Sequence, residues 1–179
     1  MKSLRLIGRR FLAAGSFLDF ERLHYAASDG RHAAREIVHH PGAVAVVPVL
    51  GDEVILIAQD RIPVGDRLLE IPAGKRDKTD EPLEVTAIRE CEEEIGFRPR
   101  RLTPLGSFYT TPGFSDERIW LFKGEDLEAV PVRPQGPEEE MAEIVRLPIS
   151  EALRRVDDGE ILDVKTLIGL HSLRREFRP

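Results

Sequence analysis

Residues 70–97 read EIPAGKRDKTDEPLEVTAIRECEEEIGF, and the fold of this region can be worked out from that stretch. The apolar residues Leu68–Ile71 predict a short strand, and Gly74 follows it in a turn. An amphipathic segment then runs from about Pro82 to Ile95. Proline suits the first position of a helix and Gly96 the position just past its end. The stretch therefore predicts a strand, a glycine turn and an acidic helix.

Helical geometry sorts the side chains of this segment onto different faces. An apolar face is expected from residues at helical spacing, namely Ala87, Ile88, Cys91 and Ile95. Cys91 is therefore interpreted as a packing residue. Glu92 should point nearly the opposite way to Glu90.

Three carboxylates, Glu90, Glu93 and Glu94, share one face because they lie three and four positions apart. Like charges at this spacing repel, so the cluster favours a cation between them, and hard cations such as Mg²⁺ take oxygen ligands. Arg89 can reach Glu93 at i+4 and hold it in place. A solvated acidic face is the simpler interpretation of such a helix taken alone. The strand and glycine turn before it favour the metal site.

The rest of the chain predicts a layered α/β domain with mixed strand pairing. The valine-rich run Ala43–Leu50 is typical of a strand covered on both faces. Further strands are expected at 17–25, 33–39, 54–58, 102–108, 119–122 and 144–147. Short helices are expected from Ser150 to Val156 and from an Asp163 cap to the C-terminus. Function-bearing loops are expected at 61–67, 110–117 and 130–140.

Composition places the chain among globular proteins of one domain: it has 179 residues, 41% of them hydrophobic and 32% charged. The lone cysteine excludes an intramolecular disulfide framework and suits a reducing compartment. We find no secretory signal and no apolar run long enough for a bilayer, so we expect a cytoplasmic protein without a membrane partner. The net charge of −6 argues against nucleic acid as a partner.

The acidic helix and the turn before it resemble the Nudix box of the Nudix hydrolases. That pattern is Gly, five residues, Glu, seven residues, then Arg-Glu-hydrophobic-any-Glu-Glu-any-Gly-hydrophobic. Every fixed position from Glu81 to Phe97 matches. Six residues rather than five separate Gly74 from Glu81, and this extra residue lies in the loop before the helix.

The likeness continues through segments 43–49, 59–61, 70–74 and 111–117 and the N-terminal β section, all similar to the ADP-ribose pyrophosphatase branch. The resemblance implies the Nudix fold, an α/β/α sandwich around a mixed β-sheet with an N-terminal antiparallel β section. It also implies a homodimer. Residues 1–40 would form the β section, with dimerisation and substrate contacts, and residues 41–179 the Nudix hydrolase domain.

In that branch the implied activity is hydrolysis of the diphosphate of ADP-ribose, to AMP and ribose 5-phosphate, by water attack on phosphorus. The implied cofactor is Mg²⁺, or Mn²⁺ in its place. The resemblance implies metal ligands at Glu90, Glu93, Glu94 and the backbone carbonyl of Ala73. Arg89 would orient a ligand carboxylate, and Glu81 would play a similar supporting part.

The resemblance also implies a general base, a Glu on the loop before the last strand. Here that loop is 135–140, and counting back from Leu147 favours Glu139, with Glu140 next; a single gap would exchange them. The same acidic run, which begins at Glu138, also reads as a solvated segment.

Four residues are expected to bind substrate: Arg61, Glu70, Glu117 and Phe17. Arg61 would face the diphosphate, because guanidinium pairs with phosphate oxygens, although a surface salt bridge is the alternative. Glu117 would contact the terminal ribose or a water on the metal. Phe17, with Phe20 and Tyr25, is a candidate for stacking on the base, although strand aromatics more often belong to a core.

Other functions remain in competition. The nearest is hydrolysis of other nucleoside diphosphate sugars such as ADP-glucose or GDP-mannose, because the box handles the diphosphate and not the sugar. A non-catalytic Nudix ligand-binding module is more distant, and the intact Arg-Glu…Glu-Glu pattern argues against it. An RNA-cap hydrolase would need a basic, aromatic face, and this chain has one Trp and two Tyr.

The acidic charge is concentrated in two segments. Residues 77–94 carry eight acidic and two basic residues, and residues 124–143 carry seven acidic residues and one basic residue, so each has a net charge of −6. The remainder of the chain therefore carries a net charge of +6. These two acidic segments contain the predicted metal site and the predicted loop of the general base, so the acidic charge does not exclude a phosphate substrate.

Overall fold

The computed structural model describes residues 3–76 and 80–174, and the chain divides into two compact units. The smaller unit is the chain up to Gly42 together with Phe108–Arg118. The larger unit consists of Ala43–Ser107 and the chain from Ile119 onward. No helix within the described ranges is both long and apolar enough to span a membrane.

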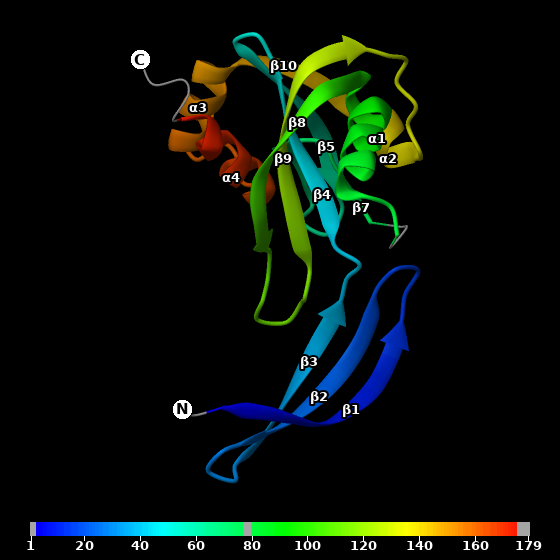
Figure 1. Cartoon of the computed structure of the whole chain (residues 1–179), viewed down its shortest axis with the longest axis vertical. Helices are drawn as coiled ribbons and strands as arrows, with labels where there is room; N and C mark the ends of the chain where they lie inside the picture. Colours follow the sequence, from blue (N-terminus) through cyan, green and yellow to red (C-terminus); the bar gives the residue numbers. More distant parts are fainter. Residues whose placement is uncertain (1–2, 77–79, 175–179) are drawn as a thin grey trace. The chain divides into compact units, whose positions relative to one another are not determined.

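The larger unit is built on a seven-stranded sheet with the order β10-β5-β4-β9-β8, to which β6 adds on β5 and β7 on β4 (Figure 1). Its strands are β4 (Ala43–Leu50), β5 (Glu53–Arg61), β6 (Asp66–Glu70), β7 (Ala73–Lys75), β8 (Phe97–Tyr109), β9 (Arg118–Ala129) and β10 (Glu143–Pro148). Strand β4 runs parallel to β9 and antiparallel to β5 and β7. The expected mixed sheet is confirmed.

Helices cover both faces of this sheet (Figure 1). They are α1 (Leu83–Ile95), α2 (Pro137–Glu140), α3 (Ile149–Asp157) and α4 (Val164–Leu173). Val44 and Val46 of β4 share a core with Cys91 of α1, whereas Gly169 of α4 lies against Val47. Because alternate residues of a strand point to opposite faces, α1 and α4 lie on opposite sides of β4. The expected α/β/α sandwich is confirmed, as is a β4 buried on both faces.

Helix α1 begins one residue later than expected, because Pro82 is its N-cap and not its first helical residue. Its end is as expected: Gly96 is the C-cap, where a φ of 67° favours glycine. The expected apolar residues are fully buried except Ile88, which is only partly buried, and Glu90 is buried with them. A carboxylate on the covered side of the helix is unusual and needs compensation.

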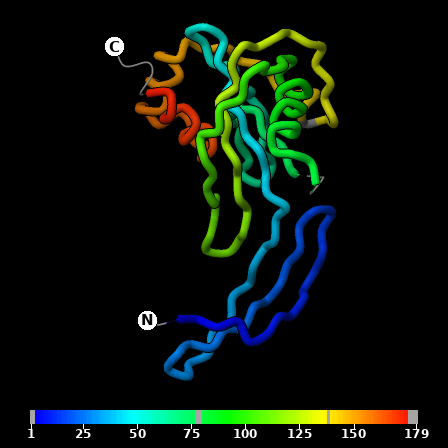
Figure 2. Tube along the Cα trace, in the orientation of Figure 1, coloured from blue at the N-terminus to red at the C-terminus, as the bar shows by residue number. Residues whose placement is uncertain are grey.

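The smaller unit contains an antiparallel sheet of β1 (Leu4–Ala14), β2 (Asp19–Ala27) and β3 (His32–His39), which Figure 2 shows as a blue meander. The loop from Thr110 to Glu117 belongs to this unit: the Val38 N–H donates to the Phe114 carbonyl over 2.8 Å. Strand β1 was not expected from the sequence. Phe17, expected at the start of a strand, lies instead in the turn between β1 and β2.

Three further local expectations changed. Helix α3 begins at Ile149 with Pro148 at its N-cap, so Ser150 is not the cap. Strand β7 and the single-turn helix α2 lie in segments expected to be loop. The Asp163 cap of α4 is confirmed, because its carboxylate accepts the Thr166 N–H over 2.9 Å.

Candidate functional site

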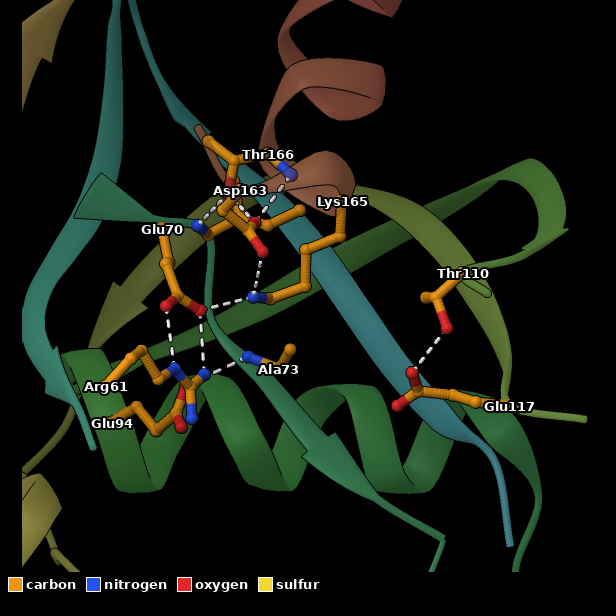
Figure 3. A network of polar contacts seen from close by, with 10 residues as sticks. Arg61, Glu70, Ala73, Glu94, Thr110, Glu117, Asp163, Lys165 and Thr166 are labelled. Atoms are coloured by element: carbon orange, nitrogen blue, oxygen red, sulfur yellow. Dashed lines mark hydrogen bonds and ion pairs between the residues drawn. The ribbon is translucent and has the colours of Figure 1, made fainter. Parts of the chain in front are cut away.

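Two carboxylates of α1 lie directly against the backbone of Ala73 and Gly74. A Cβ placed on Gly74 would come within 1.9 Å of the carboxyl carbon of Glu90. Oε2 of Glu94 accepts the N–H of Ala73 over 2.9 Å (Figure 3). The glycine is therefore required by close approach, since any side chain at position 74 would displace Glu90.

The charged forms of these two carboxylates are disfavoured. Burial raises the pKa of Glu90 to about 7; Arg89 opposes this rise, and Glu93 and Glu139 add to it. Burial also raises the pKa of Glu94 to about 8, and repulsion from Glu90 contributes. Two neighbouring carboxylates with raised pKa values form an arrangement that an added cation would stabilise.

Arg89 joins the carboxylates on this face. Its Nη1 lies 2.8 Å from Oε1 of Glu90 and 2.9 Å from Oε2 of Glu93, which confirms the expected i+4 pair. Glu92 is paired instead with Arg98 over 2.8 Å, in agreement with its expected opposite direction. Arg89 thus fixes the orientation of two of the three predicted metal ligands.

Glu81 lies beside Arg89 and Thr86. Its Oε2 accepts a hydrogen bond from Oγ1 of Thr86 over 2.9 Å and lies 3.8 Å from Nε of Arg89. This position agrees with a supporting part, through Arg89, for the carboxylates beyond it.

The residues present fit a hard divalent cation. Within the ranges that the structure describes, no three His, Cys, Asp or Glu side chains already converge as ligands. Arg89 and the Ala73 N–H each engage oxygens of these carboxylates: Arg89 pairs with Glu90 and Glu93, and the N–H donates to Glu94. Their donor atoms are all oxygens, which Mg²⁺ and Mn²⁺ prefer, and Glu90 is nearly enclosed against Gly74. Glu90, Glu93, Glu94 and the carbonyl of Ala73 could hold such an ion.

The loop before β10 approaches this face of α1. Oε2 of Glu139 accepts the N–H of Gln135 over 2.6 Å, and Nε2 of Gln135 donates to Oε1 of Glu93 over 3.2 Å. The charge of Glu139 also contributes to the raised pKa values of Glu90 and Glu94. The structure therefore brings Glu139 to the predicted metal ligands.

Its two acidic neighbours differ from Glu139. Glu140, the next residue of α2, is exposed, and the side chain of Glu138 lies outside the described part of the structure. Gln135, which links the loop to Glu93, was missed from the sequence because nothing in its neighbourhood distinguishes it from other loop residues.

Arg61 and Glu70 form a bidentate pair at the ends of β5 and β6 (Figure 3). The antiparallel register pairs Arg61 with Asp66 and Ile57 with Glu70, so Arg61 and Glu70 share one face of the hairpin. Nε and Nη2 of Arg61 each donate over 2.7 Å. Glu70 is 1% exposed, whereas Arg61 is partly exposed.

The charges of this pair stabilise each other. Burial alone would raise the pKa of Glu70, but the hydrogen bonds from Arg61 and the charge of Lys165 bring it below its usual value. The hydrogen bonds to Glu70 raise the pKa of Arg61, and Asp163 and Glu94 contribute smaller amounts. Arg61 is therefore a permanent cation close to Glu94 of α1.

Behind Glu70 lies a polar group on α4 that was missed from the sequence (Figure 3). Lys165 is 6% exposed; its Nζ donates to Glu70 and, over 3.0 Å, to Asp163. Oγ1 of Thr166 accepts the N–H of Ile71 over 2.8 Å. One sequence signal was available: Lys165 is the only Lys, Arg, Asp or Glu in the helix 164–173.

In the smaller unit, His40 connects Phe17 and Glu117. The Phe17 ring meets the His40 ring edge-on at 5.7 Å between centroids, and Nε2 of His40 lies 3.6 Å from Oε1 of Glu117. Oε2 of Glu117 accepts from the Thr110 hydroxyl over 2.5 Å. The structure therefore brings Phe17 and Glu117 to one place, on either side of His40.

The larger unit is an α/β/α sandwich in which an acidic helix meets a glycine turn beside a fixed arginine. These features define a class of α/β proteins that can hold a divalent cation next to a phosphate group. The family model described as NUDIX domain matches residues 39–166, and the chain belongs to the Nudix family.

Known proteins resemble the chain over most of its length. It is 37% identical to the ADP-ribose pyrophosphatase of Bacillus subtilis (strain 168) over 177 residues, which cover 97% of this chain and 95% of that protein. It is 38% identical to the methanol dehydrogenase activator of Bacillus methanolicus over 147 residues, covering 82% and 79%. A solved structure described as an ADP compounds hydrolase has a TM-score of 0.84 at 21% identity, covering 98% and 97%, which shows the shared fold.

Proposed function

We propose that this protein hydrolyses the diphosphate bond of ADP-ribose, with Mg²⁺ or Mn²⁺ as cofactor, and releases AMP and ribose 5-phosphate. The observation that carries the proposal is the contact of Glu90 and Glu94 with the backbone of Gly74 and Ala73 in a member of the Nudix family, with Glu139 and Arg61 near enough to interact electrostatically with Glu94. Similarity to a named ADP-ribose pyrophosphatase over nearly the whole of both chains supports the substrate.

The proposed reaction adds one water to one phosphorus. The water oxygen forms the new P–O bond, the bridging P–O bond breaks, and the bridging oxygen leaves with the other phosphate. When bound, Mg²⁺ or Mn²⁺ would neutralise part of the phosphate charge and lower the pKa of the attacking water. Glu139 accepts the proton of that water, and Glu140 is the alternative base.

The other residues of the site position these groups. Arg89 holds Glu90 and Glu93 in place, and Arg61 pairs with phosphate oxygens through the nitrogen, Nη1, that neither bond to Glu70 uses. Phe17 and Glu117 of the smaller unit are proposed to contact the base and the terminal ribose.

A panel of substrates tests this function. ADP-ribose, ADP-glucose, GDP-mannose and capped RNA are incubated with and without Mg²⁺ or Mn²⁺, and the phosphate-containing products are identified. We expect kcat/KM to be highest for ADP-ribose and turnover to disappear with EDTA. A higher kcat/KM for another nucleoside diphosphate sugar would identify that compound as the substrate in place of ADP-ribose. Binding without turnover of any compound would favour a ligand-binding module.

We also propose that the protein is a homodimer in the cytoplasm. The exposed side chains of β1 include four large apolar ones: Leu4, Leu6, Ile7 and Phe11. Strand β1 is an edge of its sheet, so a second copy could bury these side chains and pair with the open edge. Sedimentation of the wild-type protein and of Phe11→Glu tests this, and a wild-type monomer at micromolar concentration would contradict it. The single cysteine, which suits a reducing compartment, supports the cytoplasmic location.

A further inference from the structure

Lys165 of α4 is buried and contacts two carboxylates. The side chain is 6% exposed, and its Nζ donates to the carboxylates of Glu70 and Asp163. Glu70 lies 95 positions earlier in the chain, so the contact is made by the tertiary fold alone. A buried lysine with two carboxylate partners joins the start of α4 to the end of β6.

Helix α4 is fixed in place by its packing on the sheet and by the hydrogen bonds at its start. Gly169 lies so close to the sheet that a Cβ there would come within 2.7 Å of Val47. Asp163 accepts hydrogen bonds from both the N–H and the hydroxyl of Thr166, and that hydroxyl oxygen accepts the N–H of Ile71. Helix α4 therefore holds the segment immediately after Glu70 as well as Glu70 itself.

Glu70 in turn determines how Arg61 is presented. Both carboxylate oxygens of Glu70 accept from Arg61, and Oε2 also accepts from Lys165 (Figure 3). With the carboxylate held from behind, the planar guanidinium has one defined orientation. Lys165 also shares the negative charge of Glu70, so that this carboxylate does not fully cancel the charge of Arg61.

We propose that Lys165 is a positioning residue for the hydrolytic site: by anchoring Glu70 to α4 it aims Arg61 at the diphosphate of the substrate. In this arrangement Glu70 does not contact the substrate and acts through Arg61. The inference rests on the proposed function, in which Arg61 binds the diphosphate.

Steady-state kinetics of Lys165→Met provide the first test. Methionine keeps the length of the side chain and removes its charge. Because Arg61 binds the diphosphate before and during the reaction, loss of its orientation should act mainly on KM. We expect KM for ADP-ribose to rise about tenfold and kcat to stay within about threefold of wild type.

A double-mutant cycle separates positioning from general support of the fold. If Lys165 acts through Arg61, adding Lys165→Met to an Arg61→Met protein should change kcat/KM by less than about twofold. Leu170→Ala, a fully buried change on the same helix, is the stability control, and Arg154→Met removes an exposed cation paired with Glu151. Both controls should retain the wild-type KM.

Each outcome decides between the alternatives. Three results would overturn the positioning role and leave the proposed function intact. The first is a tenfold effect of Lys165→Met that persists in the Arg61→Met protein. The others are an unchanged KM in Lys165→Met alone and an equal rise in KM for Leu170→Ala. Calorimetric binding of ADP-ribose in EDTA repeats the comparison without turnover. Wild-type protein that binds ADP-ribose but does not cleave it overturns the proposed function alone, and one that neither binds nor cleaves it overturns both.

Discussion

Glu94 occupies a position where its charge is unfavourable in the absence of a cation, because burial and Glu90 raise its pKa to about 8. In the metal-free protein the folded state therefore binds this proton more tightly than the unfolded state, and stability falls as the pH rises from about 4.5 to 8. Gln at this position still accepts the Ala73 N–H and does not ionise. One residue should thus affect activity and stability in opposite directions.

We predict that Glu94→Gln lowers kcat/KM at least about a hundredfold, as expected for loss of a metal ligand. In EDTA at pH 8.5 the same variant should be more stable than wild type by on the order of 1 kcal/mol or more, with about 2–4 °C in Tm for each kcal/mol. Activity assays and thermal unfolding check both results. A less stable variant in EDTA would contradict the electrostatic explanation.

Glu139 and Glu140 are adjacent in sequence but differ in their surroundings. Of the two, Glu139 adds to the raised pKa values of Glu90 and Glu94, and its carboxylate accepts the N–H of Gln135. We predict that Glu139→Gln lowers kcat about a hundredfold or more, while Glu140→Gln stays within about tenfold. Single-turnover measurements at saturating substrate check this. A larger loss in Glu140→Gln would exchange the two roles.

The contact between β7 and α1 depends on the absence of a side chain at Gly74. A methyl group on Gly74 would overlap the carboxylate of Glu90, whose carboxyl carbon would lie 1.9 Å from it. We predict that Gly74→Ala displaces Glu90 and lowers kcat/KM about a hundredfold or more. Gly8→Ala in β1 is the matched control, since its methyl group would meet only His24 at 3.9 Å. Comparable activity in the two variants would show that Glu90 has room to move.

The loop 110–117 is tied to β3 by His39 and Asp116, whose Nδ1 and Oδ2 lie 2.6 Å apart. The hydrogen bond to Asp116 raises the pKa of His39, so this stabilisation is fully present below about pH 6.5 and is lost as the pH rises through the raised value. Burial alone would raise the pKa of Asp116, but the hydrogen bond from His39 brings it below its usual value. The stabilisation that depends on the ionised Asp116 is therefore lost only at acidic pH.

We therefore predict that Asp116→Asn costs about 0.2–1 kcal/mol of the free energy of unfolding at pH 6 and less at pH 9. Urea titrations of wild type and variant at both pH values provide the measurement, with Asp158→Asn, an exposed partner of Arg154, as a control of constant effect. A difference that does not change with pH would show that His39 carries no charge in the pair.

Elements with strong local signals were predictable from sequence, and those that depend on pairing were not. The valines of β4 and the Pro82 and Gly96 ends of α1 each determine their element locally. Strand β1 was missed because most of its side chains are exposed, so it shows no alternation, and its stability comes from pairing with β2. Helix α2 has only four residues in an acidic, proline-containing segment.

For the molecule as a whole, the carboxylate face of the site and its local support by Arg89 were predictable, whereas the supports from distant parts of the chain were not. Glu90, Glu93 and Glu94 follow from helical spacing within five residues of sequence. The contacts Lys165–Glu70 and Gln135–Glu93 join residues 95 and 42 positions apart, and no local pattern specifies such pairs. The two acidic segments, 77–94 and 124–143, contribute Glu90 and Glu139 to one site of the larger unit.

A bound cation should therefore stabilise the folded protein, because it compensates charges that folding alone brings together. A ligand that binds only the folded state adds about 2.7 kcal/mol at a hundred times its Kd. We predict that saturating Mg²⁺ raises the Tm of the wild-type protein by about 5–10 °C relative to EDTA. Because Glu94→Gln removes a ligand and part of the repulsion, its Tm should rise less. Equal shifts in the two proteins would mean that the ion binds away from α1, and Lys165→Met, which leaves every proposed ligand in place, should keep the full wild-type shift.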